Sequence, residues 1–148
     1  MDQTQLRILL ADDDEDDRLF FKRAIEVAKI KTIVTIVNDG VALMEYLSDP
    51  KTTLPDLLFL DLNMPIKSGI ECLKEIRANN RYKDLLIAIY STSASDQDVE
   101  ETFINGANIY IKKPDDFNTL KNTLAKVIAI NWQYQTSGLN KENFLLSI

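Results

Sequence analysis

The stretch Leu57-Leu58-Phe59-Leu60-Asp61-Leu62-Asn63-Met64-Pro65 joins a wholly apolar run to an acid. A short apolar run of this kind is typical of a strand buried on both faces of a parallel sheet. Two similar junctions occur in the chain: 6–11 runs into Asp12-Asp13-Asp14, and 107–111 runs into Lys112-Lys113-Pro114. Because the carboxyl ends of parallel strands form one edge of a sheet, where ligands bind, we expect these polar groups to lie together.

Apolar runs alternate along the chain with segments of helical period, the pattern of repeated strand–helix units. The expected strands are 7–11, 32–37, 56–60, 85–90 and 107–111, and the expected helices are 16–29, 40–47, 70–79, 97–105 and 115 to about 132. Right-handed crossovers between parallel strands place helices on both faces of the sheet. The sequence therefore predicts an α/β fold, a doubly wound five-stranded parallel sheet flanked by five helices.

Length and composition limit the functional classes. A chain of 148 residues that is 45% hydrophobic suits a single domain, which we place at 1–132, with a C-terminal extension at 133–148. A net charge of −6 opposes nucleic-acid binding. Cys72 is the only cysteine and histidine is absent, which excludes an intramolecular disulfide and the usual zinc sites. The chain has no long apolar run and no signal-peptide core, so we expect a cytoplasmic protein without a membrane partner.

The extension at 133–148 is polar at first and then apolar, with Phe144, Leu145, Leu146 and Ile148 near its end. Two interpretations stay open. These side chains cover their own domain, or they form a contact in a homodimer, because an uncovered apolar patch is unusual on a monomer.

Three acids are expected at the carboxyl edge of the sheet, and they would repel one another unless a cation shared them. Mg²⁺ prefers oxygen ligands and neutralises charge during phosphoryl transfer, so Asp12, Asp13 and Asp61 form a candidate magnesium site. A carboxylate such as Asp61 can form an aspartyl phosphate, and Lys113 would pair with the new anion. Lys112, one residue earlier on a strand, is expected to point to the other face. Taken alone, acids 12–17 would be a solvated helix start, and the Lys-Pro pair a turn.

From about Leu6 to Trp132 the chain resembles the receiver domains of two-component response regulators, the CheY-like proteins. The resemblance implies that Asp61 is the phosphoacceptor, that Asp12 and Asp13 bind Mg²⁺, and that Lys113 is the family's lysine before proline. Ser91 stands thirty residues after Asp61 and Lys113 fifty-two residues after it, which agrees with the spacing in that family.

The same resemblance implies roles for residues in the loops and at the strand ends. Asn63 matches the position whose backbone carbonyl completes the metal site. Ser91 matches the hydroxyl that contacts the phosphoryl group, and Tyr110 matches the aromatic switch residue. Two alternatives stay open: Thr92 could supply the hydroxyl in place of Ser91, and the pair of metal-binding acids could be shifted by one, to include Asp14.

The resemblance implies a stand-alone signalling protein that is not a classical enzyme and catalyses only its own phosphorylation and dephosphorylation. It would receive phosphate from a histidine kinase and signal through a downstream protein partner. Residues 90–93 and the tail past Trp132 look most like regulators paired with bacterial phytochromes. A magnesium-dependent phosphohydrolase would need a second acid two residues after the nucleophile, where this chain has Asn63. A receiver-like binding module that never accepts phosphate is disfavoured, because every residue of the site is present.

Overall fold

The computed structural model describes the backbone of residues 5–137 and 145–146, and the side chains of residues 5–129. Its strands are β1 (Leu6–Ala11), β2 (Thr32–Val37), β3 (Leu57–Leu60), β4 (Leu86–Ser91), β5 (Ile109–Lys112) and β6 (Leu145–Leu146). Its helices are α1 (Glu15–Ala28), α2 (Gly40–Ser48), α3 (Gly69–Ala78), α4 (Asp96–Ile104) and α5 (Phe117–Ser137), with a 3-10 turn η1 (Asn80–Tyr82). Among the helices of the described part, none is long and apolar enough to cross a membrane.

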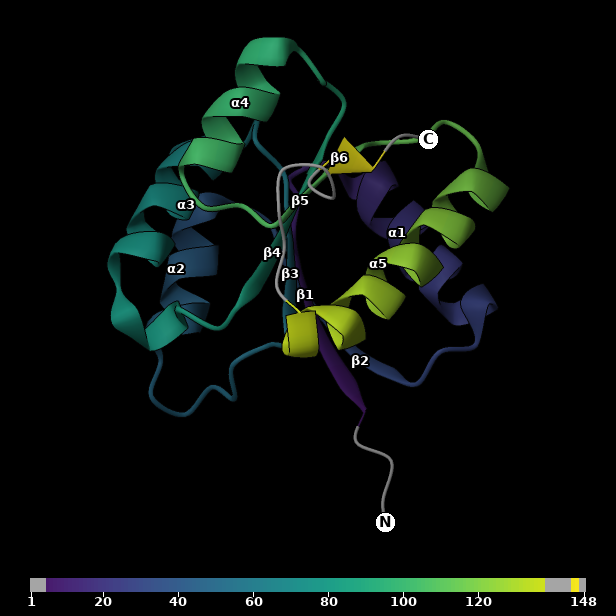
Figure 1. Cartoon of the computed structure of the whole chain (residues 1–148), viewed down its shortest axis with the longest axis horizontal. Coiled ribbons are helices and arrows are strands. Elements are labelled where there is room, and N and C mark those ends of the chain that lie inside the picture. The colour runs from purple at the N-terminus through teal and green to yellow at the C-terminus, as the bar shows by residue number, and fades with distance from the viewer. Residues whose placement is uncertain (1–4, 138–144, 147–148) are drawn as a thin grey trace.

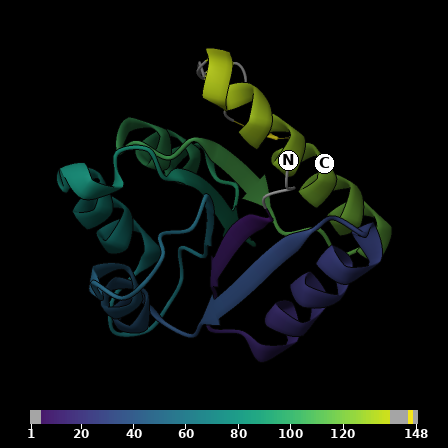
Figure 2. The same cartoon turned by 90° about the horizontal axis from the view of Figure 1, so that it is seen from below.

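The strands form one parallel sheet in the order β2-β1-β3-β4-β5-β6. Helices α1 and α5 cover one face of this sheet, and α2, α3 and α4 cover the other (Figures 1 and 2). The chain winds outward in both directions from β1, so the order of the strands reverses between β1 and β3. The predicted doubly wound α/β fold is confirmed, and the reversal provides the switch point at which such sheets bind ligands.

The apolar run of β3 is continuous because both faces of the strand are buried. Phe59 packs under α1 and α5, with its ring edge-on to Phe21 at a centroid distance of 4.9 Å. Leu58 and Leu60 point to the other face, where they meet the side chains of α2 and α3. Cys72 lies in this second cluster and is fully buried, as a packing residue would be. The strand that carries Asp61 is thus fixed from both sides.

The starts of the helices are set by short polar side chains that accept hydrogen bonds from free backbone amides. The caps are Asp14 for α1, Asp39 for α2, Ser68 for α3 and Ser95 for α4. Ser68 forms a reciprocal capping box with Glu71.

The C-terminal region departs from the sequence prediction in two ways. Helix α5 continues to Ser137, beyond the expected end near Trp132. In addition, Leu145 and Leu146 pair with Tyr110 and Ile111, so a sixth strand lies along the outer edge of β5. A strand of two residues has no periodicity to detect, and the exposed edge of β5 supplies its partners. The rest of the predicted apolar patch lies outside the described residues, so the homodimer contact stays a prediction.

Arg77 ties α3 to the connections around β4 and β5. Its guanidinium donates to the carbonyl oxygens of Gly106, Tyr82 and Leu85 at 2.8, 3.1 and 2.8 Å, and to Asn108 Oδ1 at 2.7 Å. Gly106 has a φ of 98°, and a Cβ there would lie 2.9 Å from Arg77 Cγ. The contact therefore requires glycine at this turn for both space and backbone conformation. The Arg77 guanidinium therefore links α3 to two segments of the chain, 82–85 and 106–108.

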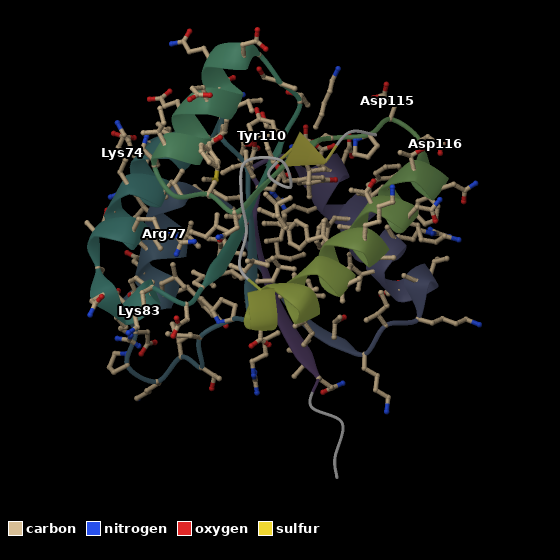
Figure 3. All side chains as sticks on the ribbon, in the orientation of Figure 1. Lys74, Arg77, Lys83, Tyr110, Asp115 and Asp116 are labelled. Carbon is tan, nitrogen blue, oxygen red and sulfur yellow. The ribbon has the colours of Figure 1, made fainter. Side chains whose placement is uncertain are left out.

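We expect Arg77→Met to lower the free energy of unfolding by about 2–4 kcal/mol, because it removes four hydrogen bonds to partly buried acceptors. The change is measured by urea denaturation. Lys74→Met is the matched control, since Lys74 is exposed on the same helix (Figure 3); it should shift the free energy by less than about 0.5 kcal/mol. Equal losses in the two variants would contradict the proposed role of the Arg77 contacts.

Candidate functional site

Three acids meet at the carboxyl edge of the sheet. Asp12 directly follows β1, and Asp61 directly follows β3, with its backbone amide bonded to the carbonyl of Ala11 at 3.0 Å. Each of Asp12, Asp13 and Asp61 offers an oxygen within 4.8 Å of those of the other two. Asp12 and Asp61 are buried, whereas Asp13 is exposed. The acids that the sequence singled out thus lie together.

The loop after Asp61 is held by very close packing against the start of α3. A Cβ at Gly69 would lie 2.2 Å from the carbonyl oxygen of Asp61, so only glycine fits there. The amide of Gly69 donates to Leu62 O at 2.9 Å, and the amide of Asn63 donates to Asp61 Oδ1 at 3.3 Å. Ile66 in this loop has a φ of 70°, a conformation that a β-branched residue rarely adopts. The conformation of this loop is therefore imposed by the packing of the loop against its neighbours and not by the backbone preference of Ile66.

Lys113 brings one positive charge to these acids. Its Nζ lies 2.8 Å from Asp17 Oδ2, 2.9 Å from Asp12 Oδ2 and 3.5 Å from Asp61 Oδ2, and its side chain is 8% exposed. Burial acts to lower the pKa of Lys113, but the neighbouring carboxylates outweigh it and raise that pKa above its usual value. Lys113 is therefore a fixed cation. Lys112 is exposed and, among the described residues, forms no ion pair with these acids.

Three residues of the site were missed in the sequence analysis. Asp17 binds Lys113, Arg18 Nη1 donates to the carbonyl of Asp12 at 3.0 Å, and the ring of Tyr90 lies 5.3 Å from the Lys113 ammonium. Asp17 and Arg18 belong to the first turn of the helix that follows the first strand. The sequence did carry a signal for Asp17 and Arg18. The first turn of this helix follows Asp12 closely and therefore begins at the same edge of the sheet.

Asp61 lies in a place that disfavours its charge. Burial raises its pKa to about 7, the nearby Lys113 ammonium opposes this rise, and the Asp12 carboxylate adds to it. Without a further cation, Asp61 therefore retains a proton for much of the time near neutral pH. A nucleophilic role would require that proton to leave.

The arrangement of oxygens fits a hard divalent cation. Asp12 Oδ2 is buried and, among the described residues, accepts no hydrogen bond, although Lys113 Nζ lies nearby. Three carboxylates with oxygens within 4.8 Å of one another offer the kind of ligands that Mg²⁺ prefers. Asp14 instead caps α1 by accepting from the amide of Asp17 at 3.1 Å, so its side chain serves the helix. The geometry favours the pair Asp12 and Asp13 over the pair shifted by one.

The candidate switch residues lie beside the acids. Ser91 ends β4 and is buried, and its Oγ accepts from the amide of Ser93 at 3.2 Å. Thr92 is exposed. Tyr110, the second residue of β5, is also buried (labelled in Figure 3), and its hydroxyl donates to Ser93 O at 2.5 Å. Burial raises the pKa of Tyr110, and a hydrogen bond with Ser91 partly offsets the rise. Ser91 rather than Thr92 is therefore connected to Tyr110.

The sequence of this chain is similar to signalling proteins from several organisms. Residues 8–125 match the response regulator receiver domain family. The chain is 30% identical to the probable methanogenesis regulatory protein FilR2 of Methanothrix harundinacea over 81% of this chain and 79% of that protein. It is also 30% identical to response regulator Rcp1 of Synechocystis over 76% of this chain and 80% of that protein.

Solved structures show the same likeness. The phosphorylated cyanobacterial phytochrome response regulator RcpA has a TM-score of 0.79 and 28% identity, over 90% of this chain and 98% of RcpA. The Mn²⁺-bound form of Rcp1 has a TM-score of 0.77 and 27% identity, over 91% of this chain and 99% of Rcp1. Because the family match spans most of the sequence and the fold agrees across it, this chain belongs to the response regulator receiver domain family.

Proposed function

We propose that this chain is a single-domain response regulator that accepts a phosphoryl group on Asp61 from a histidine kinase. Receiver domains are phosphoacceptor signalling proteins, not classical enzymes, and they bind Mg²⁺ at an acidic pocket. The observation that carries the proposal is the buried Asp61 carboxylate, which lies at the end of β3 within 3.5 Å of Lys113 Nζ and beside Asp12 and Asp13.

Asp61 would act as the nucleophile. One of its carboxylate oxygens attacks the phosphorus of a phosphohistidine on the kinase. The new P–O bond forms as the P–N bond breaks, the electron pair stays on the imidazole nitrogen, and that nitrogen takes up a proton. No acid or base of this chain is required for the transfer, so its residues contribute position and charge.

The charges around Asp61 would prepare the transfer. The carboxylates of Asp12, Asp13 and Asp61 and the carbonyl of Asn63 would hold Mg²⁺, which supplies positive charge that displaces the Asp61 proton and neutralises the phosphoryl oxygens. Lys113 supplies a second positive charge at a fixed place. Together these two positive charges would favour the ionised form of the Asp61 carboxyl group, which is the form that acts as a nucleophile.

Phosphorylation would be read out through Ser91 and Tyr110. A phosphoryl group adds about two negative charges, which attract the Ser91 hydroxyl as a hydrogen-bond donor. Ser91 would then leave its contacts with Ser93 and Tyr110, and the loop after β4 would move. The changed surface would bind a downstream protein.

We further propose that the phosphate donor is a phytochrome-type histidine kinase in the cytoplasm. RcpA, a cyanobacterial phytochrome response regulator, is a structural neighbour along nearly its whole length, which supports this choice. The domain would span 1–132, with the extension at 133–148 as a contact between two copies. The phosphohydrolase alternative loses support, because Asn63 carries an amide where that mechanism needs a carboxylic acid.

We expect Asp61 to be the only phosphorylated residue. After incubation with Mg²⁺ and acetyl phosphate, intact mass spectrometry should show one added phosphoryl group on the native chain and none on Asp61→Asn. Asp56→Asn is the matched control, because Asp56 lies at the opposite end of the same strand, exposed and bonded to the amide of Arg7. An adduct on Asp61→Asn at the native level would overturn the assignment.

The affinity for Mg²⁺ should depend on the Asp61 proton. Since burial raises the pKa of Asp61 to about 7, metal binding below that pH must release a proton. We expect the apparent affinity to rise about tenfold per pH unit up to pH 7 and then to level off, as measured by calorimetry in buffers of different ionisation enthalpy. A flat profile in the native protein would contradict this.

Two substitutions, measured in the same calorimetry experiment, distinguish an acid that binds Mg²⁺ from an acid that caps α1. Asp13→Asn should weaken Mg²⁺ binding at every pH. Asp14→Asn should keep the native affinity, because Asp14 caps α1 instead, and asparagine caps about as well as aspartate.

Ser91 should transmit phosphorylation to Tyr110. Ser91→Ala is expected to accept phosphate yet to lose most of the change in the Tyr110 ring signals that NMR detects in the native protein on phosphorylation. Thr92→Ala is the control, because Thr92 is exposed, and it should keep the full change. A full change in Ser91→Ala together with a loss in Thr92→Ala would transfer the role to Thr92.

A further inference from the structure

Lys113 has three acidic neighbours, and the nearest one lies outside the candidate metal site. Its Nζ donates to Asp17 Oδ2 at 2.8 Å, and this contact has hydrogen-bond geometry. The ammonium also forms an ion pair with Asp12 Oδ2 at 2.9 Å. Asp61 Oδ2 is farther away, at 3.5 Å. Lys113 is therefore bound more directly to Asp17 than to the proposed phosphoacceptor.

Asp17 is placed to hold Lys113 without taking part in the cluster of acids. It belongs to the first turn of α1, and its carboxylate is not among the three that lie within 4.8 Å of one another. Its backbone amide donates to Asp14 Oδ1, so the helix cap fixes the turn that carries it. Its side chain is 34% exposed, whereas that of Lys113 is 8% exposed. Asp17, which lies on α1 and is partly exposed, thus restrains the buried Lys113 ammonium from the side nearer to solvent.

We propose that Asp17 is a positioning residue that holds Lys113 in its resting position and competes with the phosphoryl group for the ammonium. This inference rests on the proposed function of Asp61. In the resting protein Asp17 neutralises Lys113 and keeps it directed toward α1. An anion on Asp61 must draw the ammonium from Asp17, so the strength of this pair sets how readily the phosphorylated arrangement forms.

The expected effect is modest, because Asp17 is partly exposed. Ion pairs in such a setting contribute up to about a fivefold change in an equilibrium constant. Replacement of Asp17 by asparagine keeps the size of the side chain, removes the charge and leaves Lys113 in contact with Asp12 and Asp61. An anion at Asp61 should then bind about two- to fivefold more tightly.

Beryllofluoride, which mimics a phosphoryl group on a carboxylate, tests the proposal at equilibrium. Its half-saturating concentration is measured by NMR, with Mg²⁺ at a saturating level, for the native protein and for Asp17→Asn. Asp16→Asn is the matched control, because Asp16 is an exposed acid in the same turn and has the same charge. A gain in Asp17→Asn beyond that in Asp16→Asn supports the proposal. An equal or weaker affinity overturns it.

A double-mutant cycle separates a direct effect on Lys113 from a general change of charge. In the Lys113→Met background, Asp17→Asn should no longer tighten beryllofluoride binding beyond Asp16→Asn. If the gain persists there, Asp17 does not act through Lys113 and the inference is wrong. Failure of the proposed function appears differently: the native protein would then bind beryllofluoride no better than Asp61→Asn does.

Discussion

The structure depends on one electrostatic constraint, the burial of two carboxylates beside a single lysine. Asp12 and Asp61 are both removed from water, and Lys113 Nζ lies within 2.9 and 3.5 Å of them. Desolvation of such charges is costly, and the attraction of one ammonium offsets only part of it. The raised pKa of Asp61 expresses this imbalance. The site therefore remains short of positive charge, which is the condition that favours binding of a divalent cation.

Strand register brings these charges together. Ala11 is paired with Leu60, so the residues that follow them, Asp12 and Asp61, emerge side by side. Ser91 is paired with Lys112, and the amide of the next residue donates to Ser91 O at 2.7 Å, which directs the chain of Lys113 toward the acids. A slip of one residue in either pairing would turn a site residue to the other face. The buried apolar side chains of both faces prevent that slip.

How much could be predicted from the sequence follows from the range of the interactions involved. The strand that ends at Asp61 is recognisable because burial on both faces leaves a continuous apolar run, and an acid at its end is conspicuous. The start of α4 at a serine cap, Ser95, is likewise a local feature of the sequence. By contrast, the pair of Asp17 and Lys113 joins residues 96 positions apart, and neither residue shows it in its neighbourhood. The sixth strand was equally invisible, since its two leucines form a strand only because β5 has a free edge.

The balance of charge also affects how an anion would approach the site. Three carboxylates, those of Asp12, Asp17 and Asp61, lie within 3.5 Å of the Lys113 ammonium, and Asp13 lies beside Asp12 and Asp61. An incoming phosphoryl group would meet net negative charge at such a place, and in a partly buried site water screens that repulsion weakly. On the proposed function, a divalent cation held by these acids would lower this repulsion. An anion attached to Asp61 would in turn attract Lys113 away from Asp17, so the pairing of this lysine would depend on whether the site is occupied.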